Sequence, residues 1–175
     1  RSGIGPVTHL DASAFSTRIA GEIRDFDPTA FVSPKDANKM EPFTHYGLAA
    51  SFMALDDSGL VVDESNAERI GAIIGEGIGG ILGIEEQTAK YLEGGPRKIS
   101  PFYVPSTIIN MLAGQVSIMT GARGPNIAAV TACTTATHNI GMAMRMIQYG
   151  DADVMVAGGA EYATTPTSLG GFCAM

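Results

Sequence analysis

The first half of the chain alternates between helical spacing and short apolar runs. From about Pro42 to Ser58, apolar side chains recur every three or four positions: Phe43, Tyr46, Ala50, Met53 and Ala54. This spacing places them on one face of a helix, and Gly59 is a typical residue to end it. Ser33 and Pro34 predict the start of a shorter helix, since serine favours the N-cap and proline the first helical position.

Short apolar runs predict the strands. Ile70–Ile74, Ile127–Val130 and Val154–Ala157 are each too short for a typical helix, so we expect three buried strands there. Ser65–Glu68, just before the first of these runs, fits a short capping box. Near the start of the chain, Thr17–Ile23 predicts an exposed strand.

Three further helices are predicted in the second half. Gly80–Glu93 is followed by two glycines and a proline, Ser106–Thr120 is apolar nearly all round, as in a buried helix, and Thr134–Tyr149 is followed by Gly150. The last helix lies between two predicted strands within about thirty residues. This order predicts a parallel βαβ unit and a layered α/β fold.

The composition is that of a folded chain. Of the 175 residues, 45% are hydrophobic and 17% are charged, which excludes a disordered segment. At about 150 residues per domain, this is one domain or part of a larger one. The chain opens at Arg1 and ends without a polar tail, so we expect it to be incomplete at both ends. The 22 glycines predict many tight turns and close backbone contacts.

Charge and cysteine content narrow the partners and the compartment. The formal net charge of −7 argues against a nucleic-acid surface, which needs clustered cations. Two cysteines cannot form a disulfide framework, so a reducing, cytoplasmic location is expected. The uncharged stretch Ile99–Ala122 approaches membrane-spanning length, but polar residues and prolines interrupt it. We interpret it as protein interior and expect no membrane association.

Cys133 is the residue with the clearest chemical potential. It lies where a predicted strand ends and the helix from Thr134 begins. The free amides and the positive dipole at a helix N-terminus stabilise a thiolate and can hold an oxyanion. Small neighbours leave room for a substrate carbonyl: Ala132, Thr134, Thr135 and Ala136. The pattern fits an activated nucleophile, and it also fits a buried structural cysteine.

Other candidate groups carry weaker signals. His138 lies five residues after Cys133, about 140° around the predicted helix, so a Cys-His dyad is not expected and an interior position is favoured. His9 and His45 are interpreted as structural. Cys173 lies in a glycine-flanked segment with no clear helix N-terminus beside it. No His/Cys/Asp cluster has metal-ligand spacing, so we predict no metal site.

A glycine-rich segment tests for nucleotide binding. Gly75–Gly80 matches G-x-G-x-x-G and stands between a predicted strand and a predicted helix. The dinucleotide fingerprint also requires a second strand about twenty residues on, ending in Asp or Glu. Leu92–Lys98 has the pattern of a turn instead, and Glu76 would repel a pyrophosphate. We expect no nucleotide cofactor, and interpret the glycines as allowing close backbone approach or shaping an apolar pocket beside Ile78.

Three separated motifs resemble the β-ketoacyl-acyl-carrier-protein synthases of the thiolase-like superfamily. Thr131–Gly141 resembles their nucleophile motif, and Gly150–Glu161 resembles the strand that follows it. Gly94–Phe102 and Gly77–Gly80 most resemble the elongating type, synthase II. The likeness covers essentially the whole chain. It implies a layered α-β-α fold with a mixed sheet and buried helices, of which residues 1–175 are the N-terminal domain.

The resemblance also implies roles for individual residues. Cys133 corresponds to the acyl-accepting cysteine and its N–H to an oxyanion donor, Ile78 to a position in the acyl pocket, and Tyr103 to one that reaches the partner's pocket across a homodimer. The two catalytic histidines and the lysine of the family lie outside these residues, and His138 is not one of them. The implied reaction is acyl transfer to Cys133, then decarboxylative condensation with malonyl-carrier protein, without a cofactor.

The implied partner is an acidic acyl carrier protein. Four cations match part of the family's docking surface: Lys35, Lys39, Arg97 and Lys98. Asn38 stands where synthase II often has a basic residue, and each cation taken singly is as compatible with solvated surface charge. A polyketide-type ketosynthase, a non-catalytic chain-length partner and a nucleotide-binding module on Gly75–Gly80 are the alternatives. The presence of Cys133 counts against the non-catalytic partner.

Overall fold

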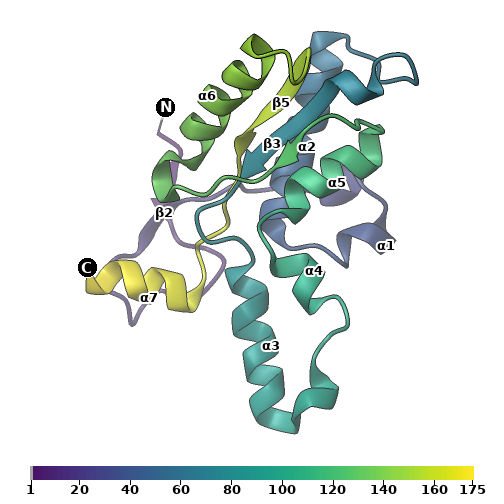
Figure 1. Ribbon diagram of the computed structural model, residues 1–175. Coiled ribbons are helices and arrows are strands. Elements are labelled where there is room, and N and C mark those ends of the chain that lie inside the picture. The colour runs from purple at the N-terminus through teal and green to yellow at the C-terminus, as the bar shows by residue number, and fades with distance from the viewer. Residues whose placement is uncertain (1) are drawn as a thin grey trace.

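The computed structural model describes residues 2–175, and a three-stranded parallel sheet forms its centre (Figure 1). The strands lie in the order β4 (Asn126–Ile127), β3 (Ile70–Gly75) and β5 (Val154–Gly159). All residues of β3 are buried, as its continuous apolar run requires. The strands predicted at 70–74 and 154–157 are confirmed.

The third predicted strand, Ile127–Val130, is wrong in extent and burial. β4 pairs with β3 through only two residues, both exposed, because the chain then leaves the sheet to form the turn at Thr131–Thr134. β4 and β5 do not pair with each other, since β3 lies between them. The predicted βαβ unit is therefore parallel but spans an intervening strand.

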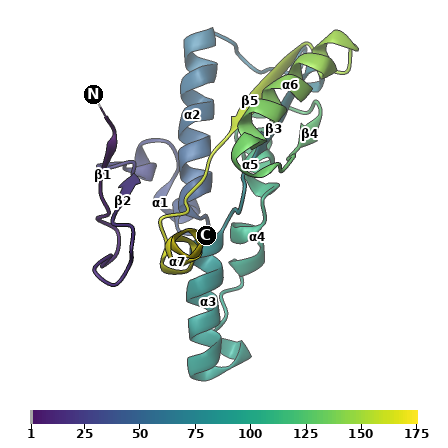
Figure 2. The same cartoon turned by 90° about the vertical axis from the view of Figure 1, so that its left-hand side faces the viewer.

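Helices cover both faces of the sheet and make three layers (Figures 1 and 2). α6 (Thr135–Gln148) packs on one face, against β3 and β5. On the other face, α5 (Met111–Thr120) packs on β3, with α2 (Pro42–Ser58) beside it. Gly59 ends α2 in the left-handed conformation, at φ 67°, as predicted.

The hydrophobic core lies between the sheet and the α2–α5 pair. Ala72 and Ile74 of β3 face this core. The two helices fill it with fully buried side chains: Phe43, Leu48, Leu112, Ala113 and Val116. Gly47 permits the close approach of the two helices, because a Cβ there would collide with Leu112. Each large side chain buried in this way contributes about 1.5–3 kcal/mol, so this face anchors the fold.

An arm extends from the end of the sheet (Figure 2). It consists of α3 (Ile81–Gly94), η3 (Pro96–Lys98) and α4 (Tyr103–Thr107). The single helix predicted at Ser106–Thr120 is wrong, because α4 and α5 are separated by an extended Ile108 at φ −75° and ψ 137°. The break lets the Thr107 carbonyl accept a hydrogen bond from the Gly80 amide at 3.1 Å, so a tertiary contact overrides local helical pattern. The stretch is not wholly interior either, since Ile118 is 72% exposed.

The N-terminal segment lies beside α2 and forms a small antiparallel ribbon (Figure 2). β1 (Ile4–Pro6) pairs with β2 (Ile19–Gly21), which confirms the predicted exposed strand. η1 (Pro28–Ala30) and α1 (Pro34–Ala37) follow. Ser33 caps α1 as predicted, because its hydroxyl accepts from the Asp36 amide.

The capping box predicted at Ser65–Glu68 is wrong. This segment is η2 (Ala67–Arg69), and no side chain caps it. The Asp63 carboxylate instead accepts from both the amide and the hydroxyl of Ser65, while Asn66 accepts from the Asp63 amide. A local Asx-type turn therefore takes the hydrogen bonds that a capping box would need.

The described chain ends in α7 (Pro166–Ala174), whose first turn is tied to α3. The Glu85 carboxylate accepts from the Thr165 hydroxyl at 2.7 Å and from the Thr167 amide at 2.9 Å. Within residues 2–175, no helix combines the length and apolar character needed to cross a membrane.

Candidate functional site

Cys133 lies in a strained turn between β4 and α6. The turn is η4 (Ala132–Thr134), and Cys133 in it is exposed. Ala132, directly before the cysteine, has φ 54°, a left-handed conformation that residues other than glycine rarely adopt. Such strain persists where the surrounding structure enforces it, and it is concentrated at functional sites. The predicted position of Cys133 at the start of a helix is confirmed.

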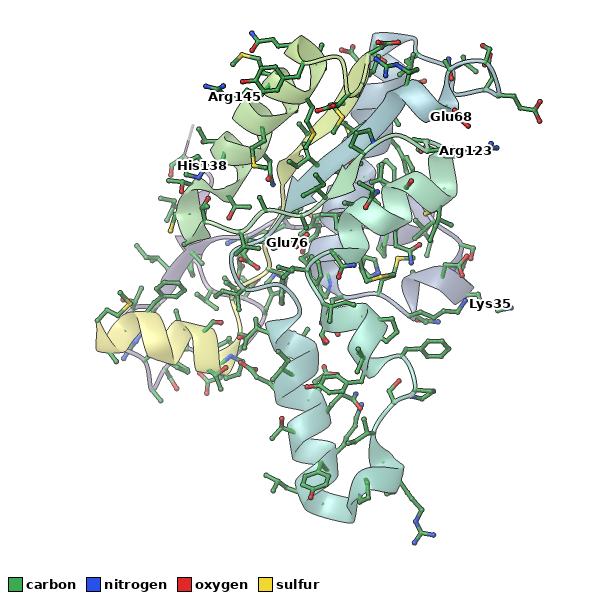
Figure 3. The ribbon with its side chains drawn as sticks, in the orientation of Figure 1. Lys35, Glu68, Glu76, Arg123, His138 and Arg145 are labelled. Carbon is green, nitrogen blue, oxygen red and sulfur yellow. The ribbon has the colours of Figure 1, made fainter. Side chains whose placement is uncertain are left out.

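Thr131 organises this turn through hydrogen bonds of its amide, carbonyl and hydroxyl groups. Its amide donates to the Thr135 hydroxyl at 2.8 Å, and its carbonyl accepts from the Thr134 hydroxyl at 2.7 Å. Its own hydroxyl lies 2.6 Å from Nδ1 of His138. His138 is exposed, so the predicted interior position is wrong. The reason is that His138 lies on a face of α6 that points away from the sheet (Figure 3), where its ring meets the Thr131 hydroxyl.

An apolar pocket of about 490 Å³ opens beside Cys133. The loop after β3, the start of α6, the segment after β5, and α7 all contribute to it. Its apolar walls come from several small and large side chains: Ile78, Ala136, Ala160, Ala163, Phe172 and Met175. Ile78, singled out from the sequence, thus lies in the same pocket as Cys133 and is 41% exposed there.

The glycine-rich loop at 75–80 is filled by a carboxylate of the chain itself. Glu161, two residues beyond the end of β5, accepts hydrogen bonds from the Gly77 amide at 2.9 Å, the Ile78 amide at 2.8 Å and the Gly79 amide at 3.3 Å. Consecutive amides of this kind form the concavity that binds phosphate in nucleotide-binding loops. Here these donors are engaged by Glu161, which argues against the nucleotide-binding alternative.

The glycines of this loop permit close backbone packing. A Cβ at Gly75 would collide with the Ala129 carbonyl, and one at Gly80 would collide with Thr107. At Gly77 a Cβ would approach the Glu161 carboxylate to 3.0 Å. The interpretation of these glycines as sites of close approach is confirmed.

Glu76 is buried at the end of β3, between the sheet and α3 (Figure 3). It is 1% exposed, and neither of its carboxyl oxygens has a hydrogen-bond partner among the described residues. Burial, with a smaller contribution from the charge of Glu161, raises the pKa of Glu76 to about 8. Glu76 is therefore protonated at neutral pH, while Glu161 beside it binds three amides.

Asn139 joins α6 to the sheet and was not singled out from the sequence. It is fully buried, and its side-chain amide donates to the Gly158 carbonyl of β5 at 2.9 Å. This bond fixes the helix that follows Cys133. The available signal was a polar residue on the helix face that packs on the sheet.

The remaining histidines and Cys173 lie outside the pocket. His45 lies 3.0 Å from the Ala37 carbonyl through its Nε2, and burial lowers its pKa, which agrees with a structural role. His9 is exposed and packs against Tyr162, with ring centroids 5.7 Å apart. Cys173 lies in the last turn of α7, where hydrogen bonds from Ser16, and next from the Thr17 backbone, lower the pKa of its thiol.

The four candidate docking cations come from two segments. Lys35 and Lys39 belong to α1 and the turn after it, and Arg97 and Lys98 lie exposed in η3. Lys39 is 2.8 Å from the Asp36 carboxylate, and its ammonium group lies over the Phe102 ring, 5.9 Å from the centroid. This contact joins α1 to the connection between α3 and α4, on the side where Figure 3 labels Lys35.

Tyr103 lies apart from Cys133. It begins α4, is half-buried, and does not line the pocket beside the cysteine. Tyr103 could therefore reach an acyl pocket only in a second subunit, across a dimer interface. Over residues 2–175, no group of three or more His, Cys, Asp and Glu side chains is arranged to hold a metal ion.

Comparison with known proteins gives a consistent set of relatives. The family model "Beta-ketoacyl synthase, N-terminal domain" matches residues 1–175. A 3-oxoacyl-[acyl-carrier-protein] synthase 2 from Vibrio harveyi is 60% identical over 172 residues, and one from Coxiella burnetii is 51% identical over 175 residues. These matches cover 98% and 100% of this chain but only 41% and 42% of the relatives. The chain thus spans about two fifths of their length.

Solved structures share this fold at lower sequence identity. A β-ketoacyl synthase from Burkholderia phymatum STM815 matches with a TM-score of 0.85 and 25% identity, over 99% of this chain and 43% of that one. A type II polyketide ketosynthase, in complex with its acyl-carrier protein and bound to the hexaketide, matches with a TM-score of 0.79 and 26% identity. That match covers 86% of this chain and 44% of the other.

Proposed function

Because this chain belongs to the family of β-ketoacyl synthase N-terminal domains, we propose that the intact protein is an elongating 3-oxoacyl-acyl-carrier-protein synthase. One observation carries the proposal. An exposed cysteine stands on a strained turn at the start of a helix, beside an apolar pocket of about 490 Å³. This is the arrangement needed by a thiol that accepts an acyl chain.

The first half-reaction uses Cys133 as the nucleophile. Its thiolate attacks the carbonyl carbon of an acyl thioester, a carbon–sulfur bond forms, and the carrier's thiolate leaves. The backbone N–H of Cys133 is our candidate for one donor to the oxyanion of the tetrahedral intermediate. Its place at the start of α6 also adds the positive end of a helix dipole.

The second half-reaction returns the cysteine. Malonyl-carrier protein loses carbon dioxide, and the resulting carbanion attacks the acyl-cysteine carbonyl. A carbon–carbon bond forms, and the Cys133 thiolate leaves with the electron pair of the broken bond. The resemblance implies that the two histidines that would stabilise the enolate lie in parts of the protein outside residues 1–175. A cytoplasmic location, where thiols stay reduced, suits this chemistry.

The apolar pocket suits a hydrocarbon chain, and Ile78 is proposed to bound it. Binding of the carrier protein is proposed at four cations: Lys35, Lys39, Arg97 and Lys98. The Asp36 carboxylate partly neutralises Lys39, so we expect the other three to contribute more. A homodimer, with Tyr103 reaching the partner's pocket, completes the proposal.

A polyketide-type ketosynthase is the second candidate. The fold neighbour that holds a hexaketide supports it, at 26% identity. The 60% identity to a 3-oxoacyl-[acyl-carrier-protein] synthase 2 favours the first candidate.

Mass spectrometry of the acylated protein tests the proposal. The intact protein, incubated with acyl-carrier protein bearing a saturated acyl group, should gain one acyl group on Cys133. Cys173→Ser is the matched control and should be acylated like the parent. An acyl group on Cys173, or undiminished acylation in Cys133→Ala, would contradict the proposal.

A further inference from the structure

The loop that carries Ile78 is held in place by a residue that is distant in sequence. It leaves β3 at Gly75 and enters α3 at Ile81, and no helix or strand includes the residues between. Its amides at Gly77, Ile78 and Gly79 all donate to the carboxylate of Glu161, more than eighty residues away in sequence. One side chain from the end of β5 therefore fixes three successive amides of the loop.

A second contact holds the far end of the same loop. The Gly80 amide donates to the Thr107 carbonyl at 3.1 Å, and Gly79, at φ 78°, packs against Ile109. Ile78 thus stands between two fixed points, with its side chain in the pocket beside Cys133. The Thr107 contact is a bond between neutral groups. The Glu161 contacts involve a carboxylate, and such hydrogen bonds are roughly twice as strong as neutral ones.

The carboxyl groups of Glu76 and Glu161 lie near the same loop but differ in charge and in hydrogen bonding. Glu76 is buried without a partner and protonated at neutral pH, whereas Glu161 accepts all three amides. Substitution of a carboxyl group by a carboxamide should therefore have different results at Glu76, which lies on the loop, and at Glu161, which binds the loop from the end of β5. At Glu76 it replaces one neutral group by another, and at Glu161 it removes the charge that the amides bind.

We propose that Glu161 is a positioning residue that fixes Ile78 at the wall of the Cys133 pocket and thereby sets which acyl chains the pocket accepts. This inference rests on the proposed function. Glu161 itself belongs to the lining of this pocket, and its proposed effect is exerted through Ile78, whose amide it binds. When its hydrogen bonds are lost, the loop is released, Ile78 no longer bounds the pocket, and discrimination between short and long chains weakens.

Three variants of the intact protein test the inference: Glu161→Gln, Glu161→Ala and Glu76→Gln. The measurement is the rate of Cys133 acylation in a single turnover with acetyl, octanoyl and hexadecanoyl carrier protein, reported as the ratio of long-chain to short-chain rates. Loss of hydrogen bonds to a charged group corresponds to roughly tenfold in an equilibrium constant. We expect Glu161→Ala to change the ratio by about that factor, and Glu161→Gln, which keeps one acceptor oxygen, to change it less.

Glu76 also lines the pocket, but Glu76→Gln keeps the size of the side chain and removes no hydrogen bond, so it should keep the parent's ratio at neutral pH. Equal loss of acylation at every chain length in both Glu161 variants, with the ratio unchanged, would overturn the inference and leave Glu161 a structural residue. If no acyl chain reaches Cys133 even in the parent protein, the proposed function fails instead.

Hydrogen exchange supplies a readout that needs no turnover. In the parent protein, the Gly77, Ile78 and Gly79 amides should exchange slowly, and in Glu161→Gln at least one of them should exchange faster by roughly tenfold. The amides of β3 should keep their protection in the same variant. Unchanged exchange at all three loop amides would also overturn the inference.

Discussion

The two faces of the central sheet differ in how completely the described residues cover them. On the α2–α5 face, Phe43, Leu48 and Leu112 are fully buried. On the other face, α6 packs one side on the sheet and presents apolar side chains outward, with Ile140 57% and Met144 55% exposed. The α2–α5 face of the sheet is therefore fully covered. On the other face, α6 is apolar on its outward side as well as on the side that packs on the sheet, as in a helix that is buried on both sides.

The candidate nucleophile and its pocket lie on the second face or at the edge next to it. Cys133 lies in η4, directly before α6, and its pocket opens among loops, the start of α6 and α7. The strained Ala132 and the unpartnered carboxyl of Glu76 lie there too. The contrast indicates that stability is concentrated on one face and function on the other. Substitutions on the two faces should therefore separate these properties.

The largest separation is expected for Cys133→Ala. Acylation and condensation should fall to background, because no other residue in the pocket offers a thiol. The free energy of unfolding should stay within about 0.5 kcal/mol of the parent value, since the side chain is exposed. Acylation assays and urea unfolding of the intact protein measure the two effects. A large loss of stability would mean that the functional face also carries the fold.

Residues 1–175 expressed alone provide the next largest effect. We expect no condensation, because the resemblance to the β-ketoacyl synthases implies that the histidines that would stabilise the enolate lie outside residues 1–175. Loss of even one oxyanion donor typically lowers rates by about 10²–10³. The outward face of α6 should also promote self-association, because it leaves large apolar side chains exposed. Condensation assays and size-exclusion chromatography beside the intact protein test this. Turnover comparable with the intact protein would require a catalytic base within these residues, and His138 would have to be reconsidered.

Leu112→Ala tests the contribution of the α2–α5 face to stability. Leu112 is fully buried against Gly47, and truncation of such a leucine typically destabilises a protein by about 2–5 kcal/mol. The acyl-chain preference should be unchanged, because Leu112 does not line the pocket. The matched control is Ile147→Ala on α6, where 43% exposure predicts a loss of less than about 1 kcal/mol. Equal losses in the two variants would contradict the contrast between the faces.

The sequence predicted elements that depend on local pattern. α2, β3, α6 and β5 follow from spacing, glycine stops and continuous apolar runs, and all four are confirmed. The position of Cys133 at the start of a helix also needs only neighbouring residues.

Features that depend on distant contacts were missed. The break at Ile108 follows from the bond between Thr107 and Gly80, and the Glu161 contacts join residues more than eighty positions apart. In both cases the partners are far apart in the sequence, so no local pattern of residues indicates the contact. An acidic residue just after two glycines at the end of a strand was the available signal for Glu161.

Glu76 lies where the two faces meet and should make stability depend on pH. Its pKa is about 8 in the folded protein against a usual 4.5. Between these values the unfolded chain loses the proton and the folded chain keeps it. The free energy of unfolding should therefore fall as pH rises through this window, with a contribution from Glu76 of up to about 1.4 kcal/mol per pH unit.

Urea unfolding of the parent and Glu76→Gln across this window measures the contribution. The difference between the two proteins isolates Glu76 from Glu41, whose pKa burial also raises, to about 7. We expect the glutamine variant to lose less stability than the parent as pH increases. Parallel curves for the two proteins would show that Glu76 is ionised, or paired, in the folded state.

The smallest expected effect comes from Ile78→Phe, which probes the functional face without touching the thiol. A phenyl ring adds volume to the pocket wall, and overpacking typically costs about 1–3 kcal/mol where the site cannot relax. Long acyl chains need the space beyond Ile78 and should lose more than short ones, so the preference should move toward shorter chains. Ile118→Phe, on the exposed surface of α5, is the control and should leave the preference unchanged. Single-turnover acylation of Cys133 across a series of chain lengths provides the measurement. An unchanged profile in Ile78→Phe would place Ile78 outside the path of the acyl chain, and the pocket wall would then have to be sought among the small residues after β5.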